Sequence, residues 1–456
     1  MSDTDVRVRH CHRARPNIAL AIASALLLAA PAARALPSFA QQTGMPCVQC
    51  HTVGFGPALT PYGREFKLNG YVFGDAGSFV PLALMVQGGY THTRKEELDA
   101  PAPHTDENDN VTVDQTSLFY AGRVSQHLGV FAQATYSGID RHASWDNVDV
   151  RYARALTFGG TGVVAGVSVN NNPTIQDLWN STPGWGFPYI ASALAPAPAA
   201  APLLTGLGQT VLGASGYAMI NERVYLEVGG YRGLSDRWLS NVGLTADASS
   251  HMSGLAPYWR AALQFGAAEQ QWSVGTFGLQ ADVRPDPSLA STDRYTDIGL
   301  DATYTRIGSG PHAFAANIAL TRETRHLAAS FDAGGSDAVA NHLTTLNADL
   351  TYAYRQTWVA GTAVFDTTGS TNTALYAPAP VGGSRNGSPD SRGYLLQLEW
   401  IPFGKQDSYA RPWLNLRLGL QYVGYSKFNG DSSNYDGFGR SARDNNTLFA
   451  YFWLIS

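Results

Sequence analysis

Beyond residue 78, apolar and polar residues alternate in successive segments of about ten residues. In the segment 414–422, leucine or tyrosine occupies every even position, and Asn415, Arg417, Gly419 and Gln421 occupy the odd positions. A period of two predicts β-strands that carry one apolar and one polar face. Such strands are predicted at 79–93, 111–124, 128–139, 147–158, 161–169, 209–219, 222–232, 257–266, 270–281, 294–306, 311–324, 341–355, 357–369, 391–402, 411–424 and 444–455.

The connections between these strands alternate in length. Short turns follow the even-numbered strands, and long polar loops follow the odd-numbered ones, at 94–110, 140–146, 170–208, 233–256, 282–293, 325–338, 370–390 and 425–442. An even strand count with this sorting is typical of bacterial outer-membrane barrels and not of soluble sandwiches. Five tryptophans near strand ends suit an interfacial aromatic girdle: Trp259, Trp272, Trp400, Trp413 and Trp453. The sequence therefore predicts an all-β fold, a transmembrane antiparallel β-barrel of about 16 strands over 79–456.

Residues 1–35 read as a signal peptide, with a basic start, a short apolar core and an A-x-A cleavage site at 33–35. The apolar core is shorter than the ~20 residues of a membrane-spanning helix. Cleavage after Ala35 would remove Cys11, five arginines and two aspartates, which changes the formal charge from −5 to −8. This negative balance argues against nucleic acid and against a basic membrane-binding patch.

The stretch Cys47-Val48-Gln49-Cys50-His51 has the spacing of a covalent haem c attachment site. Two thiols at i and i+3 can each form a thioether to the porphyrin, and the adjacent His51 can ligate the iron. A zinc site would need further ligands that no second cysteine pair or histidine cluster supplies. A thioredoxin-like redox site would need a βαβ setting, which the sequence lacks. We expect one covalent haem c on Cys47, Cys50 and His51.

Residues 36–78 make a short haem module. A helix is predicted over 61–68, with Thr60 before it, proline at its first position and Asn69-Gly70 at its end. Arg64 and Lys67 on this helix could pair with haem propionates, but a solvated helix face is the favoured alternative. The apolar residues available to cover the porphyrin are Phe39, Met45, Phe55, Leu59, Phe66, Leu68 and Tyr71.

The sixth iron ligand is not determined by the sequence. Met85 on the first strand shares its phase with Gln87 and Thr91, which predicts that its side chain faces the lumen. Met85 is therefore a candidate sixth ligand, and an ordinary lumen-lining methionine is the alternative. His92 has the opposite phase and is a weaker candidate.

The small module is joined to the first strand by residues 75–78, and some 40 residues are too few to bury a core alone. Short turns on the periplasmic side place both termini there, so we expect the module to enter and plug the lumen from the periplasm. The long loop from Asn170 carries Trp179, Trp185 and Tyr189, and we expect it to fold into or over the barrel mouth. The acidic loop 106–110 reads as a solvated tip, with cation attraction as the alternative.

The motif 47–51 is followed by the run Pro61-Tyr62-Gly63-Arg64-Glu65-Phe66-Lys67-Leu68-Asn69-Gly70-Tyr71. With the leader and barrel, it resembles the fused monohaem cytochrome–porin family, whose best-known members are outer-membrane cytochromes that oxidise ferrous iron. The resemblance implies haem on Cys47 and Cys50 with His51 as axial ligand. One departure is the C-terminus, where the chain ends in serine although barrel proteins usually end on an aromatic residue.

We therefore expect an outer-membrane protein that accepts electrons from an extracellular donor and passes them to a periplasmic cytochrome or copper protein. Fe(II) is the donor that the resemblance implies, so ferrous iron oxidation is the possible activity. Two alternatives stay open: a diffusion porin whose haem module gates or senses, and extracellular electron export. We find no Ser/His/Asp set, phosphate-binding loop or supported carboxylate pair that indicates another enzyme. A monomer is the default expectation.

Overall fold

The computed structural model describes residues 38–74, 80–246, 251–267, 269–308, 310–405, 407–408, 410 and 414–456. The predicted signal peptide and the linker 75–78 lie outside the described residues, as does Trp413.

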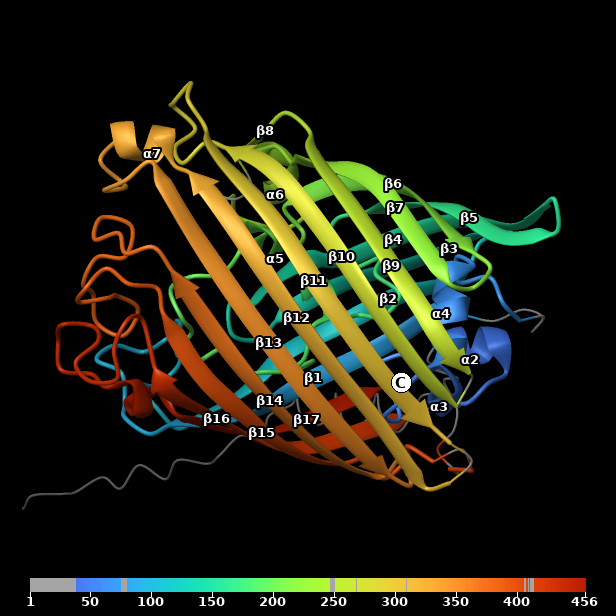
Figure 1. Cartoon of the computed structure of the whole chain (residues 1–456). Coiled ribbons are helices and arrows are strands. Elements are labelled where there is room, and N and C mark those ends of the chain that lie inside the picture. The colour runs from blue at the N-terminus through green and yellow to red at the C-terminus, as the bar shows by residue number, and fades with distance from the viewer. Residues whose placement is uncertain are drawn as a thin grey trace, which may run out of the picture. The chain divides into compact units, whose positions relative to one another are not determined.

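Sixteen long antiparallel strands close into one barrel (Figure 1), and a two-residue strand, β8, pairs with the end of β10. Pairing of β1 with β17 closes the ring: Met85 lies opposite Ile455, and Thr93 opposite Thr447. The strands are β1 (Leu82–Thr93), β2 (Asn110–Arg123), β3 (Leu128–Ser137), β4 (His142–Phe158), β5 (Thr161–Asn170), β6 (Val211–Ile220), β7 (Val224–Gly233), β8 (Met252–Ser253), β9 (Ala256–Ala267), β10 (Gln270–Val283), β11 (Asp293–Ile307), β12 (His312–His326), β13 (Ala340–Tyr354), β14 (Trp358–Gly369), β15 (Ser391–Trp400), β16 (Asn415–Lys427) and β17 (Thr447–Ile455). The predicted fold class and all sixteen predicted strands are confirmed.

Two predicted connections were wrong in length. The loop predicted at 140–146 is a short turn at 138–141, because β4 begins at His142 rather than at 147. The ladder between β3 and β4 shifts register between Ala132 and Ala134, opposite the polar pair Asp146 and Asn147. This irregularity breaks the period-two pattern at the start of β4. β15 ends at Trp400 and β16 begins at Asn415, so these two strands lie further apart in the sequence than the predicted short turn allows.

The strands turn their apolar side chains outward and their polar side chains into the lumen. On β15, Tyr394, Leu396 and Leu398 are exposed, whereas Gln397 and Glu399 are buried. A barrel in an apolar surrounding has this inverted arrangement.

The predicted tryptophan girdle is correct in part. Trp259, Trp272 and Trp400 are exposed on the outer face. Trp453 was placed there wrongly: it is 6% exposed and packs in the lumen against Phe55, with their ring centroids 5.2 Å apart. The lumen accepts this aromatic residue because the N-terminal module brings apolar side chains to it.

The helices are short: α2 (Ser38–Thr43), α3 (Cys47–Cys50), α4 (Pro61–Leu68), η1 (Pro183–Trp185), α5 (Leu203–Gly206), α6 (Asp236–Asn241), α7 (Ala328–Asp332) and η3 (Ala442–Asn445). The helix predicted over 61–68 is confirmed as α4, and the Thr60 hydroxyl accepts a hydrogen bond from the Gly63 amide at 3.1 Å. No helix among the described residues is long and apolar enough to cross a membrane.

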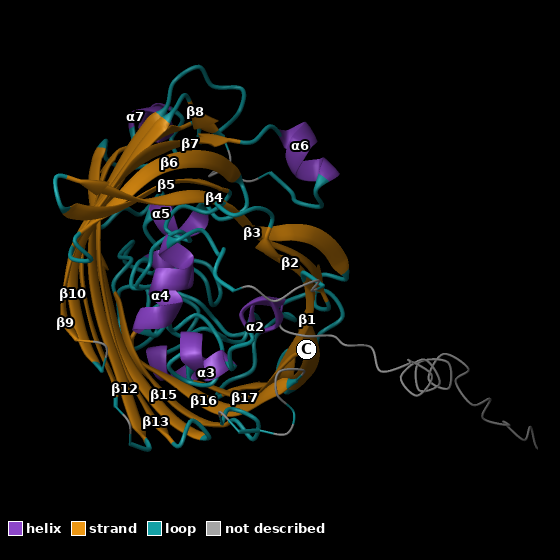
Figure 2. Ribbon diagram, turned by 90° about the vertical axis from the view of Figure 1, so that its right-hand side faces the viewer, coloured by secondary structure: helices purple, strands orange, loops and turns teal. Residues whose placement is uncertain are grey.

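The N-terminal helices α3 and α4 lie inside the ring of strands when the barrel is viewed along its axis (Figure 2). They occupy the end of the lumen where the short turns and the C-terminus are found (Figure 1). At this end, the Leu84 amide donates to the Ser456 carbonyl at 2.7 Å, so β1 begins beside the last residue. The long connection 171–210 also folds into the lumen, as predicted, and Ile175, Leu178 and Trp179 are buried there.

Candidate cofactor site

The attachment motif forms a single helical turn. In α3, the His51 amide donates to the Cys47 carbonyl at 2.9 Å, which closes the turn and brings the two cysteines to neighbouring positions. His51 then takes an extended conformation, and a β-bridge pairs it with Leu59. Both cysteines are half-buried, and no disulfide joins them.

The helix α4 packs directly on this turn. The Thr60 amide donates to the Cys50 carbonyl at 2.9 Å, and the Thr60 hydroxyl donates to the Gln49 carbonyl at 2.5 Å. A side chain at Gly63 would place its Cβ 2.2 Å from the Cys50 carbonyl oxygen. Glycine is therefore required at this position for α4 to approach the attachment turn so closely.

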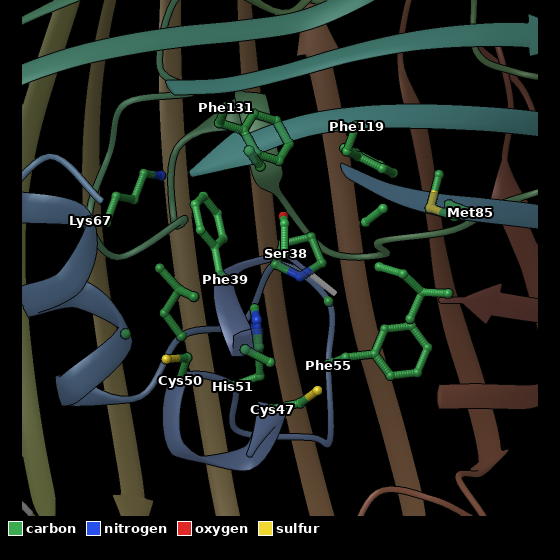
Figure 3. Close-up of a pocket in the computed structure, with 18 of the residues that line it drawn as sticks. Ser38, Phe39, Cys47, Cys50, His51, Phe55, Lys67, Met85, Phe119 and Phe131 are labelled. Atoms are coloured by element: carbon green, nitrogen blue, oxygen red, sulfur yellow. The ribbon is translucent and has the colours of Figure 1, made fainter. Parts of the chain in front are cut away.

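A cavity of about 350 Å³ adjoins the turn, and Cys47, Cys50 and His51 all line it (Figure 3). Its other walls come from three parts of the chain: Phe39, Phe55, Phe66 and Tyr71 from the module, Met85, Phe119 and Phe131 from the barrel, and Ile175, Trp185 and Tyr189 from the long loop. Of the apolar residues expected to cover a porphyrin, Leu68 was predicted wrongly. It packs on the barrel side with Tyr217 and Tyr225 and does not line the cavity.

The chemistry of the donor set fits a covalently bound haem. His51 Nδ1 is buried and has no hydrogen-bond partner among the described residues. Burial lowers the pKa of His51 to about 4, although the Gly56 carbonyl partly opposes this shift. The imidazole is therefore neutral near pH 7, which is the form that ligates a metal. Two thiols, a neutral imidazole and an aromatic cavity are the groups that haem c needs.

Met85 lines the same cavity as the attachment motif (Figure 3). Its side chain is 5% exposed, and Gln87 and Thr91 are buried on the same face of β1, so the predicted lumen phase is confirmed. His92 points outward, as predicted, and its Nδ1 lies 2.7 Å from Asp109 Oδ1. Only Met85 of these two candidates can face a group held by Cys47 and Cys50.

The solvated helix face predicted for Arg64 and Lys67 was wrong, because both side chains are buried. Arg64 donates from Nη1 to Gln271 Oε1 at 3.1 Å and from Nη2 to Thr305 Oγ1 at 2.7 Å. These partners lie on the barrel wall, more than 200 residues away in sequence. Nothing in the local sequence indicates such long-range partners.

Lys67 connects the module to the long loop through hydrogen bonds. Its Nζ donates to the carbonyls of Ile175 and Asp177, at 2.7 and 2.6 Å, and to Asn180 Oδ1 at 3.0 Å. Burial lowers the pKa of Lys67 to about 7, with the positive charge of Arg151 acting in the same direction. All three hydrogen-bond partners are oxygens of the long loop, so Lys67 ties α4 to the loop.

A buried ion cluster ties the same loop to the barrel. The Asp177 carboxylate lies 2.9 Å from Arg260 Nε, and Arg260 also forms a bidentate pair with Asp301, at 2.9 and 3.0 Å. Ser181 Oγ donates to Asp301 at 2.6 Å. Although burial alone would raise the pKa of Asp177, the charges of Arg260 and Lys67 hold it below its usual value.

A third anchor, Arg417 on β16, holds the segment after the motif. Its Nη2 donates to the carbonyl of Val53 at 3.2 Å and to that of Phe55, and its Nη1 lies 3.3 Å from Glu399. The guanidinium also stacks over the rings of Phe55 and Trp453. The strand pattern predicts Arg417 on the polar face of its strand, but it indicates no role for Arg260 or Arg417. A large cation on a lumen-facing strand position is the signal that could have indicated them.

The solvated tip predicted at 106–110 is correct in part: Asp106, Glu107 and Asp109 are exposed, and Asp109 pairs with His92 and Tyr90, whereas Asn110 is buried at the start of β2. Among the described residues, no group of three or more His, Cys, Asp or Glu side chains is arranged to hold a metal ion.

The sequence matches no protein-family model and no curated protein. Solved structures with a similar fold include OmpF of Salmonella typhi, described in complex with daunomycin (11% identity, TM-score 0.48, covering 83% of this chain and 98% of that one). An anion-selective porin from Comamonas acidovorans is 12% identical with a TM-score of 0.41, and covers 82% of this chain and 98% of its own. The outer membrane channel DcaP of Acinetobacter baumannii is 12% identical with a TM-score of 0.44, and covers 84% and 98%.

Each of these solved structures is similar to this chain in fold alone. The barrel of this chain is established by its own strand pairing.

Proposed function

We propose that this protein is an outer-membrane electron carrier that holds one haem c inside its barrel. The observation that carries the proposal is one cavity in the lumen that brings together Cys47, Cys50, His51 and Met85. Cys47 and Cys50 would hold the haem covalently, and His51 and Met85 would supply the ligands to its iron. A bound haem c supplies one-electron chemistry between ferric and ferrous iron.

The chain's own residues would orient the group and exclude water from it. The attachment turn is fixed by α4 through Thr60 and Gly63, and the next segment is fixed by Arg417. Phe55 and Phe66 are buried beside the turn, which supplies an apolar surround. Such a surround disfavours the more highly charged ferric form and so raises the reduction potential.

The position of the module and the long loop in the lumen favours electron transfer over diffusion. The module and the long loop are hydrogen-bonded to each other and to the wall, through Lys67, Arg64, Arg260 and Arg417. Because these side chains are buried and paired, release of the plug would leave buried charges without partners. A haem module that opens and closes the lumen as a gate is therefore disfavoured.

The donor and the direction of flow are proposed from the resemblance of the 47–71 motif. Extracellular Fe(II) would give one electron, and a periplasmic cytochrome or copper protein would accept it. The module lies at the short-turn end of the barrel, which is the periplasmic end in outer-membrane barrels. A haem at this end would lie within reach of a periplasmic acceptor. Extracellular electron export uses the same arrangement in the opposite direction.

The first experiment is to express the full-length protein with a c-type haem maturation system and purify it from outer membranes. Covalent haem is read on a denaturing gel by haem staining and by intact mass. We expect one haem in the wild type and none in the Cys47→Ala/Cys50→Ala variant, while both barrels keep heat-modifiable migration. A wild-type barrel without covalent haem would contradict the proposal.

A second experiment is an anaerobic optical titration of the oxidised protein with Fe(II). Rapid appearance of the reduced c-type band supports Fe(II) as donor, and a band that dithionite but not Fe(II) reduces would favour another donor or export. The second candidate function, a diffusion porin, is favoured by the closed barrel itself. Large, steady single-channel conductance in planar bilayers would support that function instead.

A further inference from the structure

A glutamine pair, with Gln87 buried and Gln115 half-buried, adjoins Met85 on the cavity wall. Gln87 is 4% exposed and donates from Nε2 to the Met85 sulfur at 3.5 Å. Gln115 on the neighbouring strand donates from Nε2 to Gln87 Oε1. Gln87 and Gln115 are register partners between β1 and β2, so the two amides lie side by side across the sheet.

The arrangement determines which end of the Gln87 amide faces Met85. Because Gln115 donates to Gln87 Oε1, the Gln87 NH₂ group is left to point at sulfur. The opposite orientation would set an amide oxygen against the sulfur lone pairs, where neither atom can donate. The two hydrogen bonds, from Gln115 to Gln87 and from Gln87 to Met85, therefore run in one direction.

A β-bulge fixes the pair in this position. The β1–β2 register shifts between Gln87 and Gly88, so that Asp114 has no partner on β1. Bulges of this kind re-aim side chains next to functional sites. Here the bulge follows the glutamine pair directly, and Met85, Gln87 and Gln115 all line the cavity that contains His51.

From this geometry we infer that Gln87 is a positioning residue that tunes the Met85 thioether as an iron ligand. The inference rests on the proposed function, because it needs haem on Cys47 and Cys50. A thioether sulfur has two lone pairs, so one can bind iron while the other accepts the Gln87 hydrogen bond. The hydrogen bond withdraws electron density from sulfur, weakens its donation to ferric iron and favours the reduced state.

The test is spectroelectrochemical titration of the purified full-length holoprotein and its variants. Gln87→Leu removes the donor at similar volume, and we expect a lower reduction potential. Gln115→Leu removes only the group that orients Gln87, so a smaller shift in the same direction is expected. If Gln87→Leu does not fold, the Gln115→Leu shift alone carries the test.

The matched control is Gln397→Leu. Gln397 is also a buried lumen glutamine that is paired across the sheet, with Gln421 donating to its Oε1 at 2.9 Å, but it does not line the haem cavity. We expect its potential to equal that of the wild type. The inference would be overturned if Gln87→Leu and Gln115→Leu had the same reduction potential as Gln397→Leu and the wild type.

A further variant separates this inference from the proposed function. Met85→Ala should keep covalent haem and lose the ferric charge-transfer band that marks thioether ligation. If Met85→Ala leaves the ferric spectrum unchanged, Met85 is not a ligand and the inference fails, while the haem proposal stands. If the wild type has no covalent haem, the proposed function itself fails.

Discussion

Replacement of Asp177 by alanine tests whether the long loop is held in the lumen by buried charges. Asp177 and Arg260 are both fully buried and lie 2.9 Å apart, and the Asp177 carboxylate also accepts hydrogen bonds from Ser181 and Thr182. Removal of one partner of a buried ion pair costs about 3–5 kcal/mol. Arg260 keeps its bidentate pair with Asp301, so the lower end, about 3 kcal/mol, is expected. At 1.36 kcal/mol per factor of ten, the loop should open roughly 100-fold more often.

Hydrogen–deuterium exchange on peptides covering 172–178 measures this opening. The amides of Ile175 and Asp177 bond to the carbonyls of Asn172 and Thr174, not to the carboxylate. Faster exchange at these two amides therefore reports opening of the loop rather than loss of one acceptor. The control is Asp286→Ala, since Asp286 is exposed and its carboxylate accepts hydrogen bonds from Ser288 in its own loop. Exchange that stays within a few-fold of the wild type in Asp177→Ala would refute the role given to this cluster.

Three further predictions concern the module and the loop. Arg417→Met should raise exchange of the Phe55 amide by roughly 100-fold, because Arg417 binds the carbonyls of Val53 and Phe55, whereas the exposed Arg392→Met should not. Gly63→Ala should lower the yield of covalent haem several-fold on a haem-stained gel, since its Cβ would lie 2.2 Å from the Cys50 carbonyl oxygen. The control is Gly216→Ala, whose added Cβ would have no heavy atom within 4 Å, and its haem yield should match that of the wild type. Because the pKa of Asp177 is lowered on folding, its contribution is present above the unfolded pKa of about 4 and is lost as the pH falls further. Exchange of 172–178, corrected for intrinsic rate, should stay constant from pH 7 to 5 and rise below pH 4; a rise already at pH 6 would contradict this.

The strands were predictable because period-two alternation is a local property of the sequence. Where polar residues interrupt it, as at Asp146 and Asn147, the start of the strand was missed. The two-residue β8 is too short to show any alternation.

The site was predictable only where it is local. The motif 47–51 and the helix 61–68 are set by neighbouring residues, and the phase of Met85 follows from its strand. The burial of Arg64 and Trp453 depends on partners far away in the chain, which no local pattern encodes. The same holds for the glutamine pair beside Met85, which forms only through the register of β1 and β2.

Electron transfer across the barrel is tested with proteoliposomes that hold the full-length holoprotein and a trapped soluble c-type cytochrome. Fe(II) is added outside under anaerobic conditions, while reduction of the trapped cytochrome and release of trapped potassium are followed together. We expect reduction of the trapped cytochrome without potassium release, and no reduction with the Cys47→Ala/Cys50→Ala variant. Potassium release that accompanies reduction, or that occurs without it, would show an open channel and contradict the account.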